Sequence, residues 1–169
     1  MQALPLHIRL DDLSDPRIAR FLEEHLQDMR ATSPPESVHA LDLDKLREPS
    51  VHFWSAWWPS DAAPDGTLVG TGALKRLDAQ HAELKSMRTV ATFRGKGIAR
   101  QVLLHILEQA RALGFQHLSL ETGTQPFFAP AHQLYLSQGF ESCGPFGSYT
   151  LDPNSRYLTM ALQPSSLPC

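Results

Sequence analysis

The spacing of apolar residues changes several times along the chain, and each change predicts a new secondary-structure element. A weak alternation predicts a strand over 6–10, and helical spacing over 18–29 predicts a helix that begins at Ser14-Asp15-Pro16. This helix must end before Ser33-Pro34-Pro35, because proline lacks an amide donor and restricts the residue before it. A second short helix is expected over 37–46.

The rest of the chain predicts strands at first and then helices that alternate with strands. Trp54 and Trp58 should share one face of the first of these strands, with Trp57 on the other. The pattern contains no internal repeat and indicates an α+β fold in a single domain over 1–169, with the tail 164–169 disordered. The expected elements are strands at 51–58, 67–77, 82–90, 117–121, 141–146 and 157–162, helices at 97–113 and 130–138, and a turn at 59–66.

The composition excludes several classes of protein. The 169 residues are 42% hydrophobic and 20% charged, with a formal net charge of −3, unlike a disordered chain or a basic, non-specific nucleic-acid binder. Cys143 and Cys169 are too few for a disulfide scaffold or a four-thiolate zinc site. The first ten residues lack a signal-peptide pattern, and no apolar stretch is long enough to cross a bilayer. We therefore expect a cytoplasmic protein that binds neither nucleic acid nor membrane.

The strongest local signal is the segment Thr92-Phe93-Arg94-Gly95-Lys96-Gly97-Ile98-Ala99-Arg100, which leaves a predicted strand and enters the long predicted helix. The start of a helix presents unpaired N–H groups and a partial positive charge. The two glycines allow positive φ and a close approach of the backbone, and the three basic side chains add charge. Together these features predict a site for the phosphates of a ligand.

Two other kinds of phosphate loop do not fit this segment. A Walker A loop that ends at Gly95-Lys96 needs glycine where Val90 stands. A dinucleotide-binding fingerprint that starts at Gly95 needs glycine where Arg100 stands, and one that starts at Gly70 needs it where Lys75 stands. A plain strand–helix turn with solvated basic residues is the remaining alternative.

The segment Arg94-Gly95-Lys96-Gly97-Ile98-Ala99 is similar to the Arg/Gln-x-x-Gly-x-Gly/Ala motif of the GNAT superfamily of acyl-CoA-dependent N-acyltransferases. Residues 82–90 resemble that family's fourth strand. The stretch Ala131-x-x-Leu134-Tyr135-x-x-x-Gly139-Phe140 resembles its fourth helix and the turn that follows. The order of elements is similar along nearly the whole chain. The resemblance implies a mixed, strongly twisted central sheet flanked by helices.

The resemblance also implies a site for acetyl-CoA as co-substrate. The loop amides would bind the pyrophosphate, and the strand before the loop would hydrogen-bond the pantetheine arm through its backbone. A backbone N–H at a bulge in this strand, most directly that of Met87, would polarise the thioester carbonyl. Phe128 departs from the family, because many members have an asparagine there. The implied cofactor-binding residues are Met87, Thr89, Arg94, Gly95, Lys96, Gly97, Ile98, Ala99 and Arg100.

Two residues are candidates for proton transfer. An amine must be neutral to attack a thioester, and the departing thiolate takes up a proton. In many members of the family a glutamate in the place of Glu83 acts as a base through water, and Tyr135 matches a tyrosine that protonates the sulfur. The alternatives are a Glu83 that faces solvent at a strand edge and a Tyr135 that only packs.

The acceptor is expected to enter opposite the cofactor, past the first helices and the final strands, as it does in this family. Glu36 and His39 could form part of its wall, and Glu121 and Thr122 end a strand beside the expected pantetheine. An ordinary loop and a polar strand end are the alternatives. Together with Glu83, these carboxylates favour a cationic acceptor such as an amino acid or a small amine.

Other kinds of chemistry find little support in the sequence, and we expect no metal. His81-Ala82-Glu83 imitates the His-x-Glu of zinc deaminases, but the Pro-Cys-x-x-Cys that completes their site is missing. Glu36-x-x-His39 is a single motif where a di-iron bundle needs two. Gly-x-Ser-x-Gly is absent, and Cys143 is expected to pack and not to act as a nucleophile.

The sequence therefore predicts an enzyme, an N-acetyltransferase that moves an acetyl group from acetyl-CoA to the primary amine of a small molecule by direct attack. A CoA-binding sensor or interaction module with a degenerate acceptor site is the alternative, because Phe128 replaces the usual asparagine. A relative of the fold that binds no CoA is a third. Members of the family are often dimers, so a homodimer is a further expectation.

Overall fold

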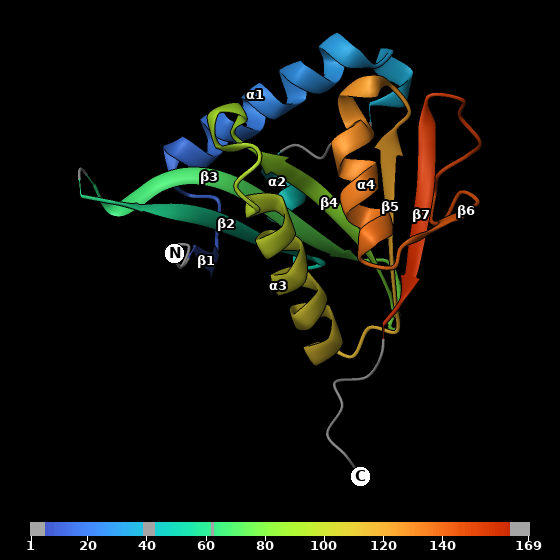
Figure 1. The fold of residues 1–169 in the computed structure, drawn as a ribbon. Coiled ribbons are helices and arrows are strands. Elements are labelled where there is room, and N and C mark those ends of the chain that lie inside the picture. The colour runs from blue at the N-terminus through green and yellow to red at the C-terminus, as the bar shows by residue number, and fades with distance from the viewer. Residues whose placement is uncertain (1–5, 39–42, 62, 163–169) are drawn as a thin grey trace.

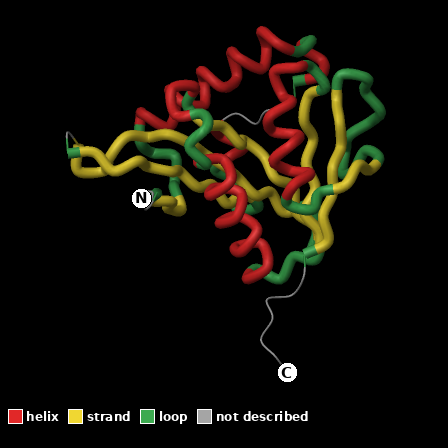
Figure 2. The backbone as a smooth tube through the Cα atoms, in the orientation of Figure 1, coloured by secondary structure: helices red, strands yellow, loops and turns green. Residues whose placement is uncertain are grey.

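The computed structural model describes residues 6–38, 43–61 and 63–162 and arranges them around a seven-stranded sheet (Figures 1 and 2). The strand order is β1-β2-β3-β4-β5-β7-β6, and β4 and β5 form the parallel pair in an otherwise antiparallel sheet. This mixed sheet flanked by helices is the predicted fold class. The strands are β1 (His7–Leu10), β2 (Val51–Ser60), β3 (Ala63–Arg76), β4 (His81–Thr89), β5 (His117–Gly123), β6 (Glu141–Cys143) and β7 (Ser155–Ala161). The helices are α1 (Pro16–Thr32), α2 (Leu43–Leu46), α3 (Ile98–Ala112) and α4 (Ala129–Ser137), with short 3₁₀ turns η1 (Pro35–Ser37), η2 (Ala91–Phe93) and η3 (Pro126–Phe128).

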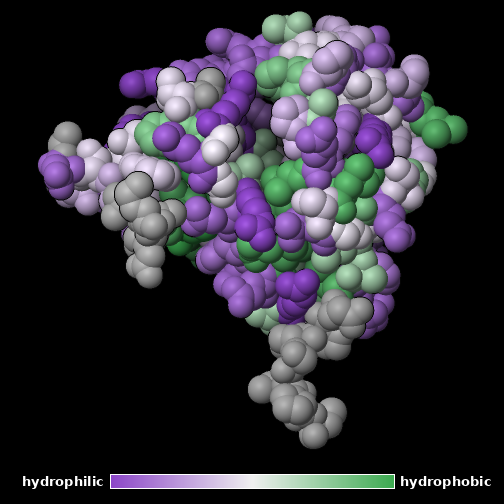
Figure 3. Space-filling model, viewed as in Figure 1, coloured by the Kyte–Doolittle hydropathy of each residue, from purple (hydrophilic) through white to green (hydrophobic). Residues whose placement is uncertain are grey.

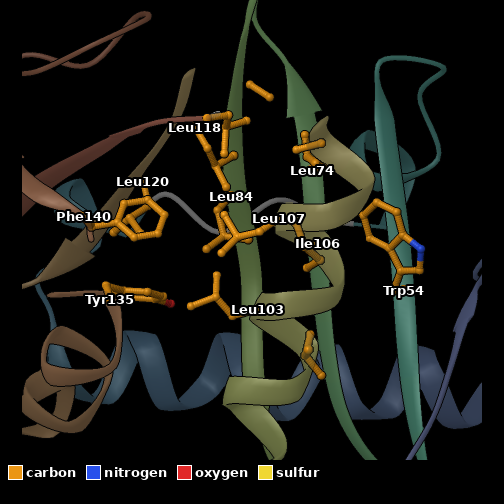
Figure 4. Close-up of a cluster of buried hydrophobic side chains, with 14 of the residues drawn as sticks. Trp54, Leu74, Leu84, Leu103, Ile106, Leu107, Leu118, Leu120, Tyr135 and Phe140 are labelled. Carbon is orange, nitrogen blue, oxygen red and sulfur yellow. The ribbon is translucent and has the colours of Figure 1, made fainter. Parts of the chain in front are cut away.

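Helices cover both faces of the sheet, with α3 and α4 on the near side in Figure 1. The predicted alternation in β2 is confirmed, because Trp54 is buried in the cluster under α3 while Trp57 is buried in the cluster under α1. The cluster under α1 and α2 comprises Leu13, Ile18, Leu22, Leu46, Phe53, Trp57 and Ala73. The larger cluster under α3 and α4 includes Trp54, Leu74, Leu84, Leu103, Ile106, Leu118, Leu120 and Phe140 (Figure 4).

Local sequence signals set the starts of the two long helices. The Asp15 side chain accepts the amide of Arg17 at 2.8 Å, and Pro16 occupies the first turn of α1, where its missing N–H costs nothing. α3 begins after Gly97, whose φ of +77° is left-handed. Among the described residues, no helix has the length and apolar character needed to cross a membrane.

β4 and β5 separate partway along their length, and this divergence positions the site. Their parallel pairing ends where Leu84 lies opposite Leu120. Just beyond, β4 bulges against β3, and Ser86 adopts a φ of +56°. The Thr71 hydroxyl donates to the Ser86 carbonyl at 2.7 Å and so holds the bulge in place. The bulge expected in this strand is therefore present, on a stretch of β4 that β5 no longer pairs with.

The expected helix over 37–46 is wrong at its start. Two prolines direct the chain into η1 instead, and Val38 is already extended, with φ −92° and ψ 112°. The helical part that the structure describes is α2, which covers only Leu43–Leu46. Residues 39–42 and the tail 164–169 lie outside the described residues.

Two further boundaries differ from expectation on the sheet. The segment 59–66, predicted as a turn, lies mostly within the long ribbon of β2 and β3, with a register shift between Trp58 and Ser60. Such an irregularity accommodates Pro59 within a strand. The strand predicted over 141–146 ends at Cys143, ahead of Gly144-Pro145.

Candidate functional site

A cleft with two adjoining lobes opens where β4 and β5 diverge, and Figure 3 shows its hollow between the start of α3 and α4. The large lobe, of about 550 Å³, lies between β4, the start of α3 and α4. The small lobe, of about 100 Å³, lies between β4, β5 and α1. The residues that line both lobes form what we call the neck: His25, Met87, Phe128, Ala131 and Tyr135.

The large lobe ends on backbone amides at the start of α3. Gly95 and Gly97 have φ of +83° and +77°, and a Cβ at either position would meet nothing within 4 Å, so the backbone itself forms the surface. The first turn of α3 carries no acidic residue that would neutralise the positive end of the helix dipole. Arg94 and Arg100 are exposed at the rim. This end of the cleft suits the phosphates of an extended ligand.

The small lobe contains a buried carboxylate that accepts two hydrogen bonds. Glu83 is 3% exposed, and its Oε2 accepts from the Tyr149 hydroxyl at 2.5 Å and from Lys85 Nζ at 3.1 Å. Lys85 Nζ also donates to the Tyr149 hydroxyl at 3.0 Å. Burial and the adjacent charge of Glu83 raise the pKa of Tyr149 well above its ordinary value, so the hydroxyl remains a donor at neutral pH.

The neck between the lobes carries no net charge at neutral pH. Tyr135, on α4, is 6% exposed and packs edge-on against Phe140 at 5.6 Å between ring centroids (Figure 4). Burial raises the pKa of the Tyr135 hydroxyl well above 10, so the group is protonated. His25 reaches the neck from α1. Burial and the nearby charge of Arg88 lower the pKa of His25 to about 4, so its imidazole is neutral at pH 7.

The predicted site residues meet at this cleft, with three exceptions. Lys96 lies with its Nζ 6.0 Å from the centroid of the Trp58 ring and does not line either lobe. Glu36 is exposed on η1 and lines neither lobe, and His39 falls outside the described residues. The alternative of a solvent-facing Glu83 is wrong, because that side chain is buried. The residues that line the large lobe include Met87, Thr89, Arg94, Gly95, Gly97, Ile98, Ala99 and Arg100, and those of the small lobe include Glu83, Glu121, Thr122 and Tyr135.

The polar residues His25, Lys85 and Tyr149 contribute to the site but were not predicted, and the first two carry a signal in the sequence. His25 lies four positions from both Phe21 and Met29, on the inward stripe of α1. Lys85 alternates with Glu83 and so shares its face of β4. Tyr149 has no local signal, because it lies 66 positions from the carboxylate to which it donates.

A cleft that joins helix amides at one end to a buried carboxylate at the other can hold a phosphorylated carrier and expose the reactive end of that carrier to a second substrate. This arrangement is typical of an enzyme that transfers a group from a carrier such as an acyl-CoA.

Residues 18–140 match the model of the Acetyltransferase (GNAT) family, and the chain belongs to that family. It is 50% identical over 157 residues to the uncharacterized N-acetyltransferase YsnE of Bacillus subtilis (strain 168), covering 93% of this chain and 100% of that relative. It is 48% identical over 155 residues to the uncharacterized N-acetyltransferase YedL of Escherichia coli (strain K12), covering 92% and 94%. The crystal structure of a GNAT family acetyltransferase from Elizabethkingia anophelis with acetyl-CoA bound has a similar fold, with a TM-score of 0.63 and 18% identity over 93% of this chain and 98% of that one. The protein is therefore an acyl-CoA-dependent acetyltransferase, as the sequence predicted.

Proposed function

We propose that the protein transfers the acetyl group of acetyl-CoA to the primary amine of a small molecule, by direct attack of the amine on the thioester. The observation that carries this proposal is the cleft at the divergence of β4 and β5, which joins a helix start to a buried carboxylate through an uncharged neck. Membership of the family supports the use of acetyl-CoA. The chemistry of the two lobes supports transfer of the acetyl group from CoA in the large lobe to an amine in the small lobe.

The large lobe fits the CoA portion of the donor. The amides of 95–99 would bind the pyrophosphate, with Arg94 and Arg100 adding charge-assisted bonds. The backbone around Met87 and Thr89 would hydrogen-bond the pantetheine arm in the manner of an added strand, because β5 has already diverged there. Acetyl-CoA, when bound, supplies an activated carbonyl and a thiolate leaving group.

Three groups of this chain would act on the reacting atoms. The N–H of Met87, next to the bulge, would donate to the oxygen that gains charge in the transition state. Glu83 would accept the proton of the attacking amine through a water molecule. Tyr135, which is protonated at neutral pH, would give the proton on its Oη to the leaving sulfur.

The size and charge of the small lobe support a small amine as acceptor. Its volume of about 100 Å³ is small beside the 550 Å³ of the large lobe and suits a small acceptor. Glu83 and Glu121 contribute two carboxylates to its wall and Lys85 one ammonium group, so these three side chains carry a net negative charge. That net charge favours a cationic amine.

Release of free thiol from acetyl-CoA in the presence of a mixed pool of small amines tests the proposal. We expect thiol release that depends on the amines, and a mass increase of one acetyl group in the amine that is consumed. Binding of CoA by calorimetry without thiol release would identify a sensor and overturn the proposal. Absence of CoA binding would overturn it as well.

Substitutions at Glu83 and Tyr135 test the proton transfers separately. We expect Glu83→Gln to remove the acidic limb of the pH–rate profile and Tyr135→Phe to lower kcat with little change in KM. An unchanged profile in both variants would contradict the roles given to these residues.

A further inference from the structure

Phe128 lies at the neck, where its ring packs against the end of β5. The side chain is 7% exposed and lines both lobes. A Cβ built on Gly123 would lie 2.2 Å from Cε2 and 2.5 Å from Cδ2 of this ring, so only glycine leaves room for it. His132 Nε2 donates to the Gly123 carbonyl at 2.8 Å, and Phe127 packs edge-on at 5.0 Å between ring centroids. The surroundings therefore hold the ring in one place.

This position places the ring beside the carbons of an acyl group. Under the proposed function, Met87 acts on the oxygen and Tyr135 on the sulfur of the thioester, and both residues share the neck with Phe128. Carbons beyond the carbonyl must then pass the ring to enter the small lobe. That lobe measures about 100 Å³ and must also admit the acceptor amine. A methyl group fits this space far better than a longer chain.

We propose that Phe128, seated on Gly123, determines acyl-chain specificity and restricts the donor to acetyl-CoA. The inference rests on the proposed function, because it needs the thioester to lie at the neck. The bulk of the ring excludes a longer chain, whereas a smaller residue would open a path along the apolar wall that Leu84 and Leu120 provide. Phe128, which stands where many members of the family have asparagine, would then change which acyl-CoA is accepted without preventing acyl transfer.

The test compares kcat/KM for acetyl-, propionyl- and butyryl-CoA on the full chain, with the same pool of amines. In the wild type we expect a fall of about tenfold or more for each added methylene, the usual discrimination of a hydrophobic pocket. In Phe128→Ala we expect propionyl-CoA to come within about threefold of acetyl-CoA. Phe128→Leu should lie between the two and preserves the test if the alanine variant does not fold. Leu136→Ala, on the exposed side of α4, is the matched control and should keep the wild-type ratio.

A second pair of variants tests the contact between the Phe128 ring and Gly123. Gly123→Ala places a Cβ against Phe128 and should displace the ring, which changes the ratio between donors. In the double variant Gly123→Ala with Phe128→Ala that clash is gone, because the other close neighbour is the flexible end of Gln125. We expect the double variant to match Phe128→Ala, so that the effects are strongly non-additive.

The outcomes separate this inference from the proposed function. If the wild type acetylates amines but Phe128→Ala and Phe128→Leu keep the wild-type ratio, the inference is wrong and the function stands. The inference would also be overturned if Gly123→Ala changed the ratio of kcat/KM between donors as much in the Phe128→Ala background as it does in the wild type. A wild-type chain that binds CoA but releases no thiol overturns the proposed function and, with it, this inference.

Discussion

The hydrogen bond from Tyr149 to Glu83 gives the sharpest test of the small lobe. Tyr149→Phe removes the donor that lies 2.5 Å from Glu83 Oε2 and leaves Lys85 Nζ, at 3.1 Å, on that oxygen. A hydrogen bond to a charged group contributes about 1.5 to 3 kcal/mol. If that energy holds the carboxylate in its reactive position, kcat/KM should fall by about 10- to 100-fold.

Tyr157→Phe is the matched control for this experiment. Tyr157 belongs to the same aromatic group as Tyr149, at 5.7 Å between ring centroids, but its hydroxyl donates to the Thr150 carbonyl at 2.7 Å. Both variants keep their rings and lose one hydroxyl. In urea denaturation the free energy of unfolding should fall by about 1 kcal/mol in Tyr157→Phe, which loses a bond to a neutral carbonyl, and by about 1.5 to 3 kcal/mol in Tyr149→Phe, which loses a bond to a carboxylate. Only Tyr149→Phe should lose activity to acetyl-CoA and an amine. Equal losses of activity in the two variants would refute the reasoning.

Two further predictions concern the neck and the loop. In the folded state, burial and then the charge of Arg88 lower the pKa of His25 to about 4, against an opposing effect of Asp28. Between pH 6.5 and pH 4 the unfolded chain therefore binds more protons than the folded chain, and the free energy of unfolding decreases as the pH is lowered. From pH 7 to pH 5, the free energy of unfolding of His25→Gln in urea denaturation should therefore decrease by about 2 kcal/mol less than that of the wild type. Equal decreases in the two proteins would contradict the lowered pKa of His25. Gly97→Ala must hold an alanine at φ +77°, at a cost of about 1 to 2 kcal/mol, and should weaken CoA binding in calorimetry by about fivefold or more. Gly144→Ala, where φ is not positive and a Cβ would meet nothing within 4 Å, should bind CoA like the wild type.

The large lobe could be predicted from the sequence because it is built from contiguous backbone. The loop from Arg94 to Arg100 forms the end of this lobe, and both its shape and its charge follow from glycines and basic residues at fixed spacing. The positive φ of Gly95 and Gly97 is a local property that glycine permits. The bulge at Ser86 followed from resemblance alone, since no residue near it requires a left-handed conformation.

Two boundaries on the sheet differ from expectation for opposite reasons. Pro59, with Gly66 and the polar residues between them, indicates a turn, yet pairing along β2 and β3 draws this segment into the ribbon. The strand predicted over 141–146 has the opposite cause, because Gly144 and Pro145 end β6 at Cys143. Phe146 there packs against His81 at 5.8 Å and against Tyr157 at 6.2 Å between ring centroids. The pairing of β2 with β3 cannot be read from the residues of the segment itself, whereas the end of β6 can.

The small lobe could not be assembled from the sequence because segments far apart in the chain must converge on it. The loop between β6 and β7 carries Tyr149 to Glu83 across 66 positions, and the Ser37 hydroxyl ties this loop to η1 by donating to Asp152 at 2.6 Å across 115 positions. A change in the length of either loop would therefore reshape the small lobe and leave the glycine loop untouched. Under the proposed function, the large lobe therefore sets the donor, and the loop that carries Tyr149 shapes the site for the acceptor.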